Sequence, residues 1–147
     1  KTEAAAKKTL VDIGVSRETI KQLDVYIELL RLWSRSTNLV GARSLSEVWS
    51  RHVLDSAQIY SHIDLEGGPL FDLGSGAGFP GIPAGIAYPE KKIVLIEASE
   101  KKSIFLHHSL ASLGLKNIEV INSRVEDLKQ PIFNEPFEIV TRAFGSV

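Results

Sequence analysis

Apolar side chains recur every three or four residues through the first third of the chain, a spacing that predicts helices. A helix over residues 3–13 is closed by Gly14, and Ser16 is a favourable N-cap for a second helix. The second helix carries one apolar stripe: Ile20, Leu23, Ile27, Leu30 and Trp33. At this spacing we interpret Trp33 as a core residue rather than as a stacking platform for a base.

A third helix is expected after the break at residues 38–41. Ser44 and Glu47 have the spacing of a capping box, which predicts a helix over residues 45–63. The segment Gly67-Gly68-Pro69 then ends the helical region. We therefore expect residues 1–66 to form an N-terminal helical extension, and residues 67–147 to form a second part that packs with it as one structural unit.

After Pro69 the pattern changes, because short apolar runs now alternate with helical ones. Strands are predicted at residues 70–73, 93–96, 118–121 and 137–140. The helices between them stop before Pro89 and at Gly114. Residues 93–96 are all apolar, which is typical of a strand buried on both faces of a parallel sheet. Alternating strands and helices predict a Rossmann-like α/β fold with a parallel, right-handed βαβ sheet.

Composition and charge narrow the class of protein. The chain has 147 residues, of which 44% are hydrophobic and 24% charged, as in a globular domain of ordinary size. The net charge of -1 disfavours a strongly basic nucleic-acid-binding protein. A slight basic excess lies in residues 1–63, with nine Lys or Arg against seven Asp or Glu. A solvated helix surface explains this excess as well as an RNA contact does.

Several chemistries are excluded within these residues. The sequence contains no cysteine, so it has no disulfide, thiolate metal site or cysteine nucleophile. A reducing cytosol suits this composition, and the sequence shows neither a secretory signal nor an apolar run long enough for a bilayer. We expect a cytoplasmic protein. We also expect both ends to be trimmed, because the chain starts without Met and stops just after a strand-like run.

The densest glycine cluster follows the first strand. Five of the eleven glycines lie between Gly74 and Gly85, beginning with the order Asp72-x-Gly74-x-Gly76-x-Gly78. Glycines at a strand–helix junction allow a sharp turn and the close approach of a ligand at the carboxyl edge of the sheet. Glu97 ends the second strand, where a carboxylate accepts hydrogen bonds from ribose hydroxyls.

Two cofactors suit this turn: S-adenosylmethionine through its carboxylate, and NAD through its pyrophosphate. Gly76-x-Gly78-x-x-Gly81 also satisfies the dinucleotide pattern, so the turn and Glu97 alone do not decide. Asp72 favours the methyltransferase pattern, in which an acid organises the glycine turn and faces the cofactor. Pro80 and Pro83 favour it too, because they remove amide donors that a pyrophosphate needs.

Several further motifs accompany the turn. They are Trp33 followed by Asn38-Leu39, Arg51-His52-Val53-Leu54-Asp55-Ser56, the turn from Asp72 to Pro83, Ser123-Arg124-Val125-Glu126 and Arg142-Ala143-Phe144. With these motifs the chain resembles the bacterial ribosomal RNA small subunit methyltransferase G family, also known as the glucose-inhibited division protein B family. The resemblance runs from about Val11 to the last residue. The turn with its two prolines is much more specific than a bare glycine pattern.

The resemblance implies a class I methyltransferase fold and a cytoplasmic enzyme that uses S-adenosylmethionine to methylate N7 of one guanosine in 16S ribosomal RNA. Its partner is that RNA or a small-subunit ribosomal particle. The family's cofactor positions fall on Gly74, Phe79, Val125, Glu126 and Arg142, with Glu97 at the ribose. Asp72, Gly76 and Gly78 complete the predicted cofactor site. The family's later strands are absent, so we expect an incomplete core, truncated at the C-terminus.

The chemistry agrees with this resemblance. Guanine N7 carries a lone pair and no proton, so its methylation needs no general base and depends mainly on alignment. Methylation at pyrimidine C5 ordinarily needs a thiolate, which this sequence lacks. Enzymes that methylate exocyclic amines usually carry an Asn/Asp-Pro-Pro-aromatic run after the fourth strand, where this chain has Thr141-Arg142-Ala143-Phe144. An NAD-dependent oxidoreductase and a non-catalytic RNA-binding domain of the same fold are the alternative functions.

Candidate contacts with the acceptor lie in the helical part: Asn38, Arg43, Arg51 and His52. Arg51, His52, Asp55 and Ser56 lie on one side of the predicted third helix. They form either a buried hydrogen-bonded face, with Asp55 paired to Arg51, or a wall of the acceptor pocket, and the sequence favours neither.

The sequence also contains candidates for phosphate contacts and histidines that could be metal ligands. Basic residues that are candidates for phosphate contacts are Lys7, Lys8, Arg31, Arg35 and Arg43, although most such residues are merely solvated. His107 and His108 lack metal-ligand spacing and are interpreted as surface residues, so no metal is expected.

Overall fold

The computed structural model describes residues 2–128 and 136–141. Its first two helices are α1 (Glu3–Asp12) and α2 (Arg17–Trp33). Ser16 caps α2 as predicted, because its Oγ accepts a hydrogen bond from the Thr19 N–H at 3.1 Å. Between the helices Gly14 has φ 99°, a conformation that side chains with a Cβ rarely adopt. The predicted stripe of α2 is confirmed, with Leu23, Ile27 and Leu30 buried and Ile20 and Trp33 packed against the same core.

The prediction of one helix over residues 45–63 is wrong. The chain forms α3 (Ala42–Ser46), a π-helical turn η1 (Trp49–Val53), α4 (Leu54–Ser56) and a 3-10 helix η2 (Ala57–His62). The predicted capping box is also wrong, because α3 begins after Gly41 and ends at Ser46, and Glu47 is its C-cap with φ -117° and ψ 27°. The buried residues Trp49, Val53, Ala57 and Tyr60 keep a spacing of three or four. Helices with different hydrogen-bond ladders bury such a stripe equally well, so the apolar pattern does not distinguish them.

Among the described residues, four strands form a parallel sheet in the order β3-β2-β1-β4. They are β1 (Leu70–Leu73), β2 (Ile93–Glu97), β3 (Ile118–Asn122) and β4 (Glu138–Thr141). Helix α5 (Gly81–Ala87) connects β1 to β2, and α6 (Glu100–Leu113) connects β2 to β3. The predicted α/β fold with a parallel sheet is confirmed, although β4 begins one residue later than expected. Because β1 is central and the chain turns to opposite sides of it, the strand order reverses there, which is where open sheets bind ligands.

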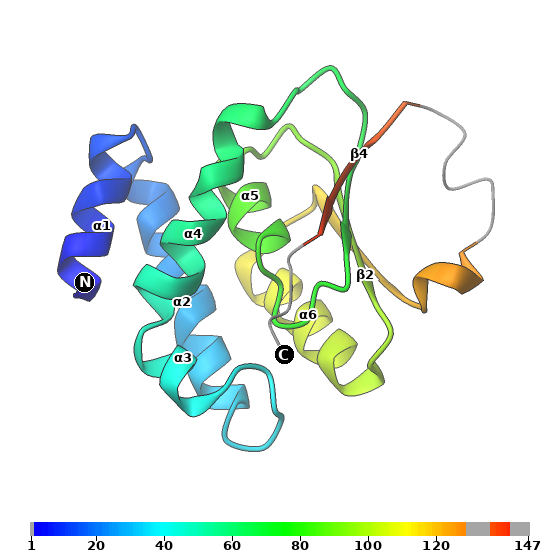
Figure 1. Ribbon diagram of the computed structural model, residues 1–147, viewed down its shortest axis with the longest axis horizontal. Helices are drawn as coiled ribbons and strands as arrows, with labels where there is room; N and C mark the ends of the chain where they lie inside the picture. Colours follow the sequence, from blue (N-terminus) through cyan, green and yellow to red (C-terminus); the bar gives the residue numbers. More distant parts are fainter. Residues whose placement is uncertain (1, 129–135, 142–147) are drawn as a thin grey trace.

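Helices α5 and α6 pack on one face of the sheet, and the N-terminal helices lie beyond them (Figure 1). One core cluster joins these layers, with Leu23 from α2, Phe105 from α6 and Leu95 from β2 among its buried members. A smaller cluster on the other face of the sheet contains Phe71 and Ile96. The helical region and the sheet region therefore share a hydrophobic core, while the boundary placed at residue 66 stays a prediction.

A buried lysine forms hydrogen bonds that connect the amino ends of strands β1, β2 and β4. Lys91, just before β2, is 1% exposed. Its Nζ donates to the carbonyl oxygens of Asp64 at 2.5 Å and Gly68 at 2.7 Å, and it pairs with the Glu138 carboxylate at the start of β4. A buried ammonium is tolerated only when its three protons are bonded, as they are here. Lys91 thus anchors the edge of the sheet opposite the glycine-rich turn.

In the part of the chain that the structure describes, no helix has the length and apolar character to cross a membrane.

Candidate cofactor site

The glycine-rich turn joins β1 to α5 at the carboxyl edge of the sheet. Gly74, Gly76 and Gly78 all have positive φ, of 73°, 58° and 104°, so the turn needs residues without a Cβ at these places. The N–H groups of Gly74 and Ser75 both donate to the Ile96 carbonyl oxygen, at 2.9 and 3.0 Å. The turn is therefore bonded to the end of the neighbouring strand β2.

Glu97, the last residue of β2, is bonded to the same turn. Its Oε1 accepts the Gly76 N–H and its Oε2 accepts the Ser99 N–H, both at 2.7 Å. The side chain is 8% exposed. Because each carboxylate oxygen has two lone pairs, Glu97 retains acceptor capacity for further hydroxyl groups. The position of Glu97 at this edge follows from the sequence, whereas its bond to Gly76 is seen only in the structure.

Asp72 holds the two ends of the turn together. Its side chain is 1% exposed within β1, and its Oδ2 accepts the N–H of Gly81, at the start of α5, at 3.0 Å. A Cβ at position 81 would lie 2.8 Å from the same oxygen, so glycine is required for this approach. Asp72 thus organises the turn, and its contact with a cofactor stays a prediction.

The amino end of α5 offers little to a pyrophosphate. Pro80 and Pro83 have no N–H, the Gly81 N–H is bonded to Asp72, and the Ile82 N–H donates to the Gly78 carbonyl oxygen at 2.7 Å. A dinucleotide bound in the usual way takes its phosphate contacts from these first-turn amides. This helix start therefore disfavours the NAD alternative.

Phe79, another predicted cofactor position, lies against the helical part of the chain. Its ring is 3% exposed. It contacts the Tyr26 ring at 5.4 Å and stacks on the His52 ring at 5.0 Å with an interplanar angle of 21°. The structure thus brings His52, a predicted acceptor contact, to the cofactor turn.

Tyr26 is a further residue of the site that the sequence patterns did not indicate. Its hydroxyl donates to the carbonyl oxygen of Ala77, inside the glycine-rich turn, at 2.5 Å. The residue belongs to the buried stripe of α2, and a buried tyrosine hydroxyl usually has a hydrogen-bond partner. From this rule the sequence could have predicted that the Tyr26 hydroxyl is hydrogen-bonded, but not that its acceptor is the Ala77 carbonyl oxygen.

Val125 and Glu126 lie on a short 3-10 helix, η3 (Val125–Asp127), just after β3. Val125 is 43% exposed. Glu126 receives a hydrogen bond from Arg124 at 2.9 Å. The pKa of the Glu126 carboxyl is lowered, first by its own backbone N–H and then by Arg124, so the group is anionic at neutral pH. The β3 end is joined to the site through Ser123, whose N–H donates to the Glu97 carbonyl oxygen at 3.0 Å.

One predicted cofactor position, Arg142, lies outside the described residues, and so do Ala143 and Phe144. The roles of Val125 and Glu126 in binding a cofactor stay predictions.

The other predicted acceptor contacts are more dispersed. Arg51 Nε lies 3.0 Å from Glu47 Oε2, and Arg43 Nε lies 3.9 Å from Glu47 Oε1. Asn38 is exposed in the segment between α2 and α3. Among these four, His52 contacts the turn through the Phe79 ring.

The four residues predicted on one helix side differ in environment. Arg51 and Asp55 are exposed, His52 is half-buried and Ser56 is buried, with the Ser56 Oγ donating to the His52 carbonyl oxygen at 2.6 Å. They form neither a uniformly buried face nor a uniformly open wall.

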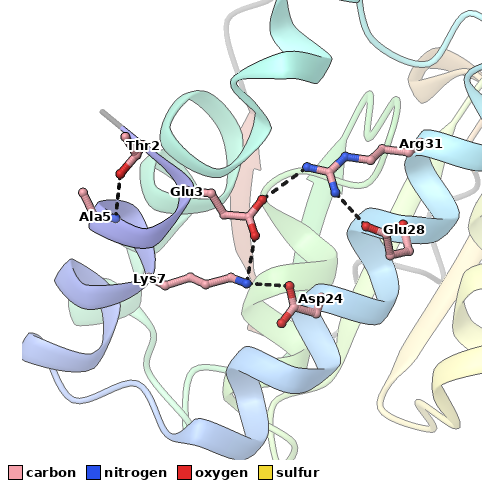
Figure 2. A network of polar contacts seen from close by, with 7 residues as sticks. All are labelled: Thr2, Glu3, Ala5, Lys7, Asp24, Glu28 and Arg31. Atoms are coloured by element: carbon pink, nitrogen blue, oxygen red, sulfur yellow. Dashed lines mark hydrogen bonds and ion pairs between the residues drawn. The ribbon is translucent and has the colours of Figure 1, made fainter.

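Most of the basic residues considered for phosphate contacts have acidic neighbours. Lys7 Nζ lies 3.0 Å from Glu3 and 2.8 Å from Asp24, and Arg31 lies 2.6 Å from Glu28 and 3.4 Å from Glu3 (Figure 2). Lys8 pairs in the same way with Asp12 at 2.9 Å. These cations join α1 to α2 or neutralise their own helix, which weakens the hypothesis that they contact phosphates.

Metal ligands are not gathered anywhere in residues 2–128 and 136–141. His107 and His108 are exposed on α6, as predicted. The His108 ring contacts Trp33 at 5.1 Å, which helps to hold α2 on α6.

Comparison with known proteins settles the family. Residues 19–147 match the family model described as rRNA small subunit methyltransferase G. The chain belongs to this family. The resemblance found in the sequence is thereby confirmed, and family membership favours a methyltransferase over the oxidoreductase alternative.

Members of the rRNA small subunit methyltransferase G family are similar over most of this chain. The ribosomal RNA small subunit methyltransferase G of Nitrosomonas europaea is 43% identical over 122 residues, covering 83% of this chain and 55% of the relative. The one from Nitrosospira multiformis is 35% identical over 147 residues, covering 99% and 66%. The one from Pseudomonas aeruginosa is 40% identical over 139 residues, covering 92% and 63%. The chain thus spans between 55% and 66% of the length of these relatives.

A solved structure shares the fold. A protein-L-isoaspartate O-methyltransferase superposes with a TM-score of 0.60 at 15% identity, covering 94% of this chain and 47% of that one. This similarity confirms the methyltransferase-type α/β fold.

Proposed function

We propose that the protein uses S-adenosylmethionine to methylate N7 of a guanosine in 16S ribosomal RNA, as free RNA or within a small-subunit particle, in the cytoplasm. Membership of the rRNA small subunit methyltransferase G family supports the reaction class. One observation supports the donor site most directly: the Glu97 carboxylate at the end of β2 is bonded to the Gly76 N–H of the turn. A carboxylate and a glycine turn thus meet where ligands of open sheets bind.

The described residues fit S-adenosylmethionine. Glu97 has acceptor capacity left for ribose hydroxyls, and Gly74, Gly76 and Gly78 present backbone without Cβ atoms to the amino-acid end of the donor. Asp72 keeps that turn in place through the Gly81 N–H. Phe79, Val125, Glu126 and Arg142 complete the proposed site on the strength of the family resemblance.

The proposed chemistry asks the chain to bind and orient rather than to move protons. When bound, S-adenosylmethionine supplies a methyl group on a sulfonium sulfur, and guanine N7 offers a lone pair that carries no proton. Alignment of the two reactants therefore accounts for much of the rate. His52, which stacks on Phe79, is the proposed acceptor contact nearest to the donor turn, with Asn38, Arg43 and Arg51 as outer contacts.

Methyl transfer tests this proposal. The protein is incubated with tritiated S-adenosylmethionine and either 16S RNA or small-subunit particles, and the labelled nucleotide is mapped by chain cleavage at N7-methylguanosine. Label at one guanine N7 supports the proposal, and the more active substrate identifies the natural acceptor. RNA binding without transfer would instead indicate a non-catalytic domain. Calorimetry with S-adenosylhomocysteine and with NAD provides an independent check, because binding of NAD alone would reject the proposed donor.

A further inference from the structure

The glycine-rich turn is held by α2 as well as by the sheet. Tyr26 is fully buried, and its hydroxyl reaches the Ala77 carbonyl oxygen at 2.5 Å across 51 residues of sequence. A hydrogen bond in such apolar surroundings is stronger than the same bond in water. One side chain of the N-terminal helices therefore bonds directly to the backbone of the proposed donor site.

The Tyr26 ring is itself fixed in position. It contacts the Phe79 ring at 5.4 Å and the Phe105 ring of α6 at 6.4 Å. Aromatic neighbours at these distances hold a buried ring in one orientation. The hydroxyl is therefore aimed at the turn by the packing of α2 on α6.

The bond to Ala77 determines the orientation of one peptide plane. The Ala77 carbonyl and the Gly78 N–H belong to the same planar unit. Tyr26 bonds the carbonyl end, and the Gly78 N–H donates to the Ser75 carbonyl oxygen at 2.8 Å. A Cβ at position 78 would lie 3.0 Å from the Tyr26 oxygen, so the tyrosine and the glycine are closely fitted. Because glycine readily adopts other conformations, this plane depends on its bonds for its orientation.

We propose that Tyr26 is a positioning residue for S-adenosylmethionine, whose hydroxyl keeps the peptide between Ala77 and Gly78 in the orientation that binds the donor. This inference rests on the proposed function. Tyr26 acts through the turn and not by touching the donor. Without the hydroxyl, the peptide plane populates other orientations, and the apparent affinity falls in proportion to the binding-competent fraction. The N-terminal helices thus contribute to donor affinity.

Two matched variants test the role of Tyr26. Tyr26→Phe removes the hydroxyl and keeps the ring that packs on Phe79 and Phe105. Tyr60→Phe is the control, because the Tyr60 hydroxyl is also buried but donates to the Pro83 carbonyl oxygen, within helix α5 and after the three positive-φ glycines, at 3.3 Å. Affinity for S-adenosylhomocysteine is measured by calorimetry on the intact protein. We expect Tyr26→Phe to bind about tenfold more weakly, the loss that one buried hydrogen bond accounts for. Tyr60→Phe should bind like the wild type.

Kinetics and hydrogen exchange separate positioning from stability. In the methyl-transfer assay, Tyr26→Phe should raise KM for the donor by the same factor and leave kcat at saturating donor unchanged. In the ligand-free protein, amide exchange over residues 74–79 should accelerate in Tyr26→Phe and not in Tyr60→Phe.

Each result has one meaning. Wild-type binding together with unchanged affinity in Tyr26→Phe overturns the inference and leaves the proposed function standing. Equal weakening in both variants also overturns it, since that result reports a general loss of stability. Absence of S-adenosylhomocysteine binding by the wild type rejects the proposed function and, with it, the role of Tyr26.

Discussion

Replacing Glu97 with glutamine should weaken both the fold and the donor site. The carboxylate accepts one N–H on each oxygen, from Gly76 and from Ser99, both at 2.7 Å. Glutamine has the same shape but only one acceptor oxygen, so its NH2 group would face the second N–H. The side chain is 8% exposed, and water cannot readily replace the lost acceptor. Loss of one charge-assisted bond then costs about 2–3 kcal/mol of unfolding free energy.

Urea unfolding followed by tryptophan fluorescence measures this loss. For a chain of this size, the same change lowers Tm by about 6–9 °C. Glu119→Gln is the matched control, because Glu119 lies on the adjacent strand β3 and its carboxylate makes an exposed contact with Lys92 at 3.7 Å. That control should change the unfolding free energy by less than about 0.5 kcal/mol. If Glu97→Gln and Glu119→Gln unfold at the same urea concentration with equal slopes, the argument from these hydrogen bonds is refuted.

Three further predictions concern stability. Lys91→Met removes a buried ammonium that is bonded to three oxygens and should cost about 3 kcal/mol in urea unfolding, whereas Lys92→Met, at a side chain 64% exposed, should cost under about 0.5 kcal/mol. Gly85→Ala places a Cβ 2.3 Å from Ile118 Cδ1 and should cost about 1–3 kcal/mol, part of which Ile118→Val recovers in a double-mutant cycle. Burial raises the pKa of Tyr60 above its ordinary value of 10.0. The unfolded chain therefore ionises first, so stability is full below pH 10 and falls above it. In urea titrations between pH 9 and 12, Tyr60→Phe should show a shallower alkaline decline, and an unchanged slope would contradict this assignment.

Much of the sheet region could be predicted because its signals are local. Residues 93–96 are apolar throughout and form a strand buried on both faces, and Ser99 and Gly114 bound α6 as a side-chain cap and a left-handed residue. Each of these features depends on residues a few positions apart.

The prediction of one continuous helix over residues 45–63 was wrong because the type of helix is not determined by such local signals. The apolar stripe of this segment suits α, π and 3-10 helices alike, and the choice among them follows from how Trp49 and Tyr60 fit the core.

In the candidate site, too, the residues with local sequence patterns could be predicted, whereas contacts between distant segments could not. Asp72, the glycines and Glu97 were recognised because strand ends and glycine turns have recognisable sequence patterns, and parallel strands bring such ends to one edge. The bond from Tyr26 to Ala77 was not recognisable, because any of several buried carbonyls satisfies a buried hydroxyl. The acidic neighbours of Lys7 and Arg31 come from a second helix as well as from their own, which composition alone does not reveal.

Chain chemistry at short range was enough to establish the parallel α/β architecture, the glycine turn after β1 and the carboxylate at the end of β2. Apolar periodicity, helix caps and glycines in turns each depend on residues a few positions apart. They can therefore be recognised in the amino-acid sequence. Tertiary packing determined which distant residues contact one another. Tyr26 bonds to the glycine-rich turn, Lys91 pairs with Glu138 at the opposite edge of the sheet, and His52 stacks on Phe79. These pairs are distant along the chain, and only the burial of a shared core makes one partner more favourable than another.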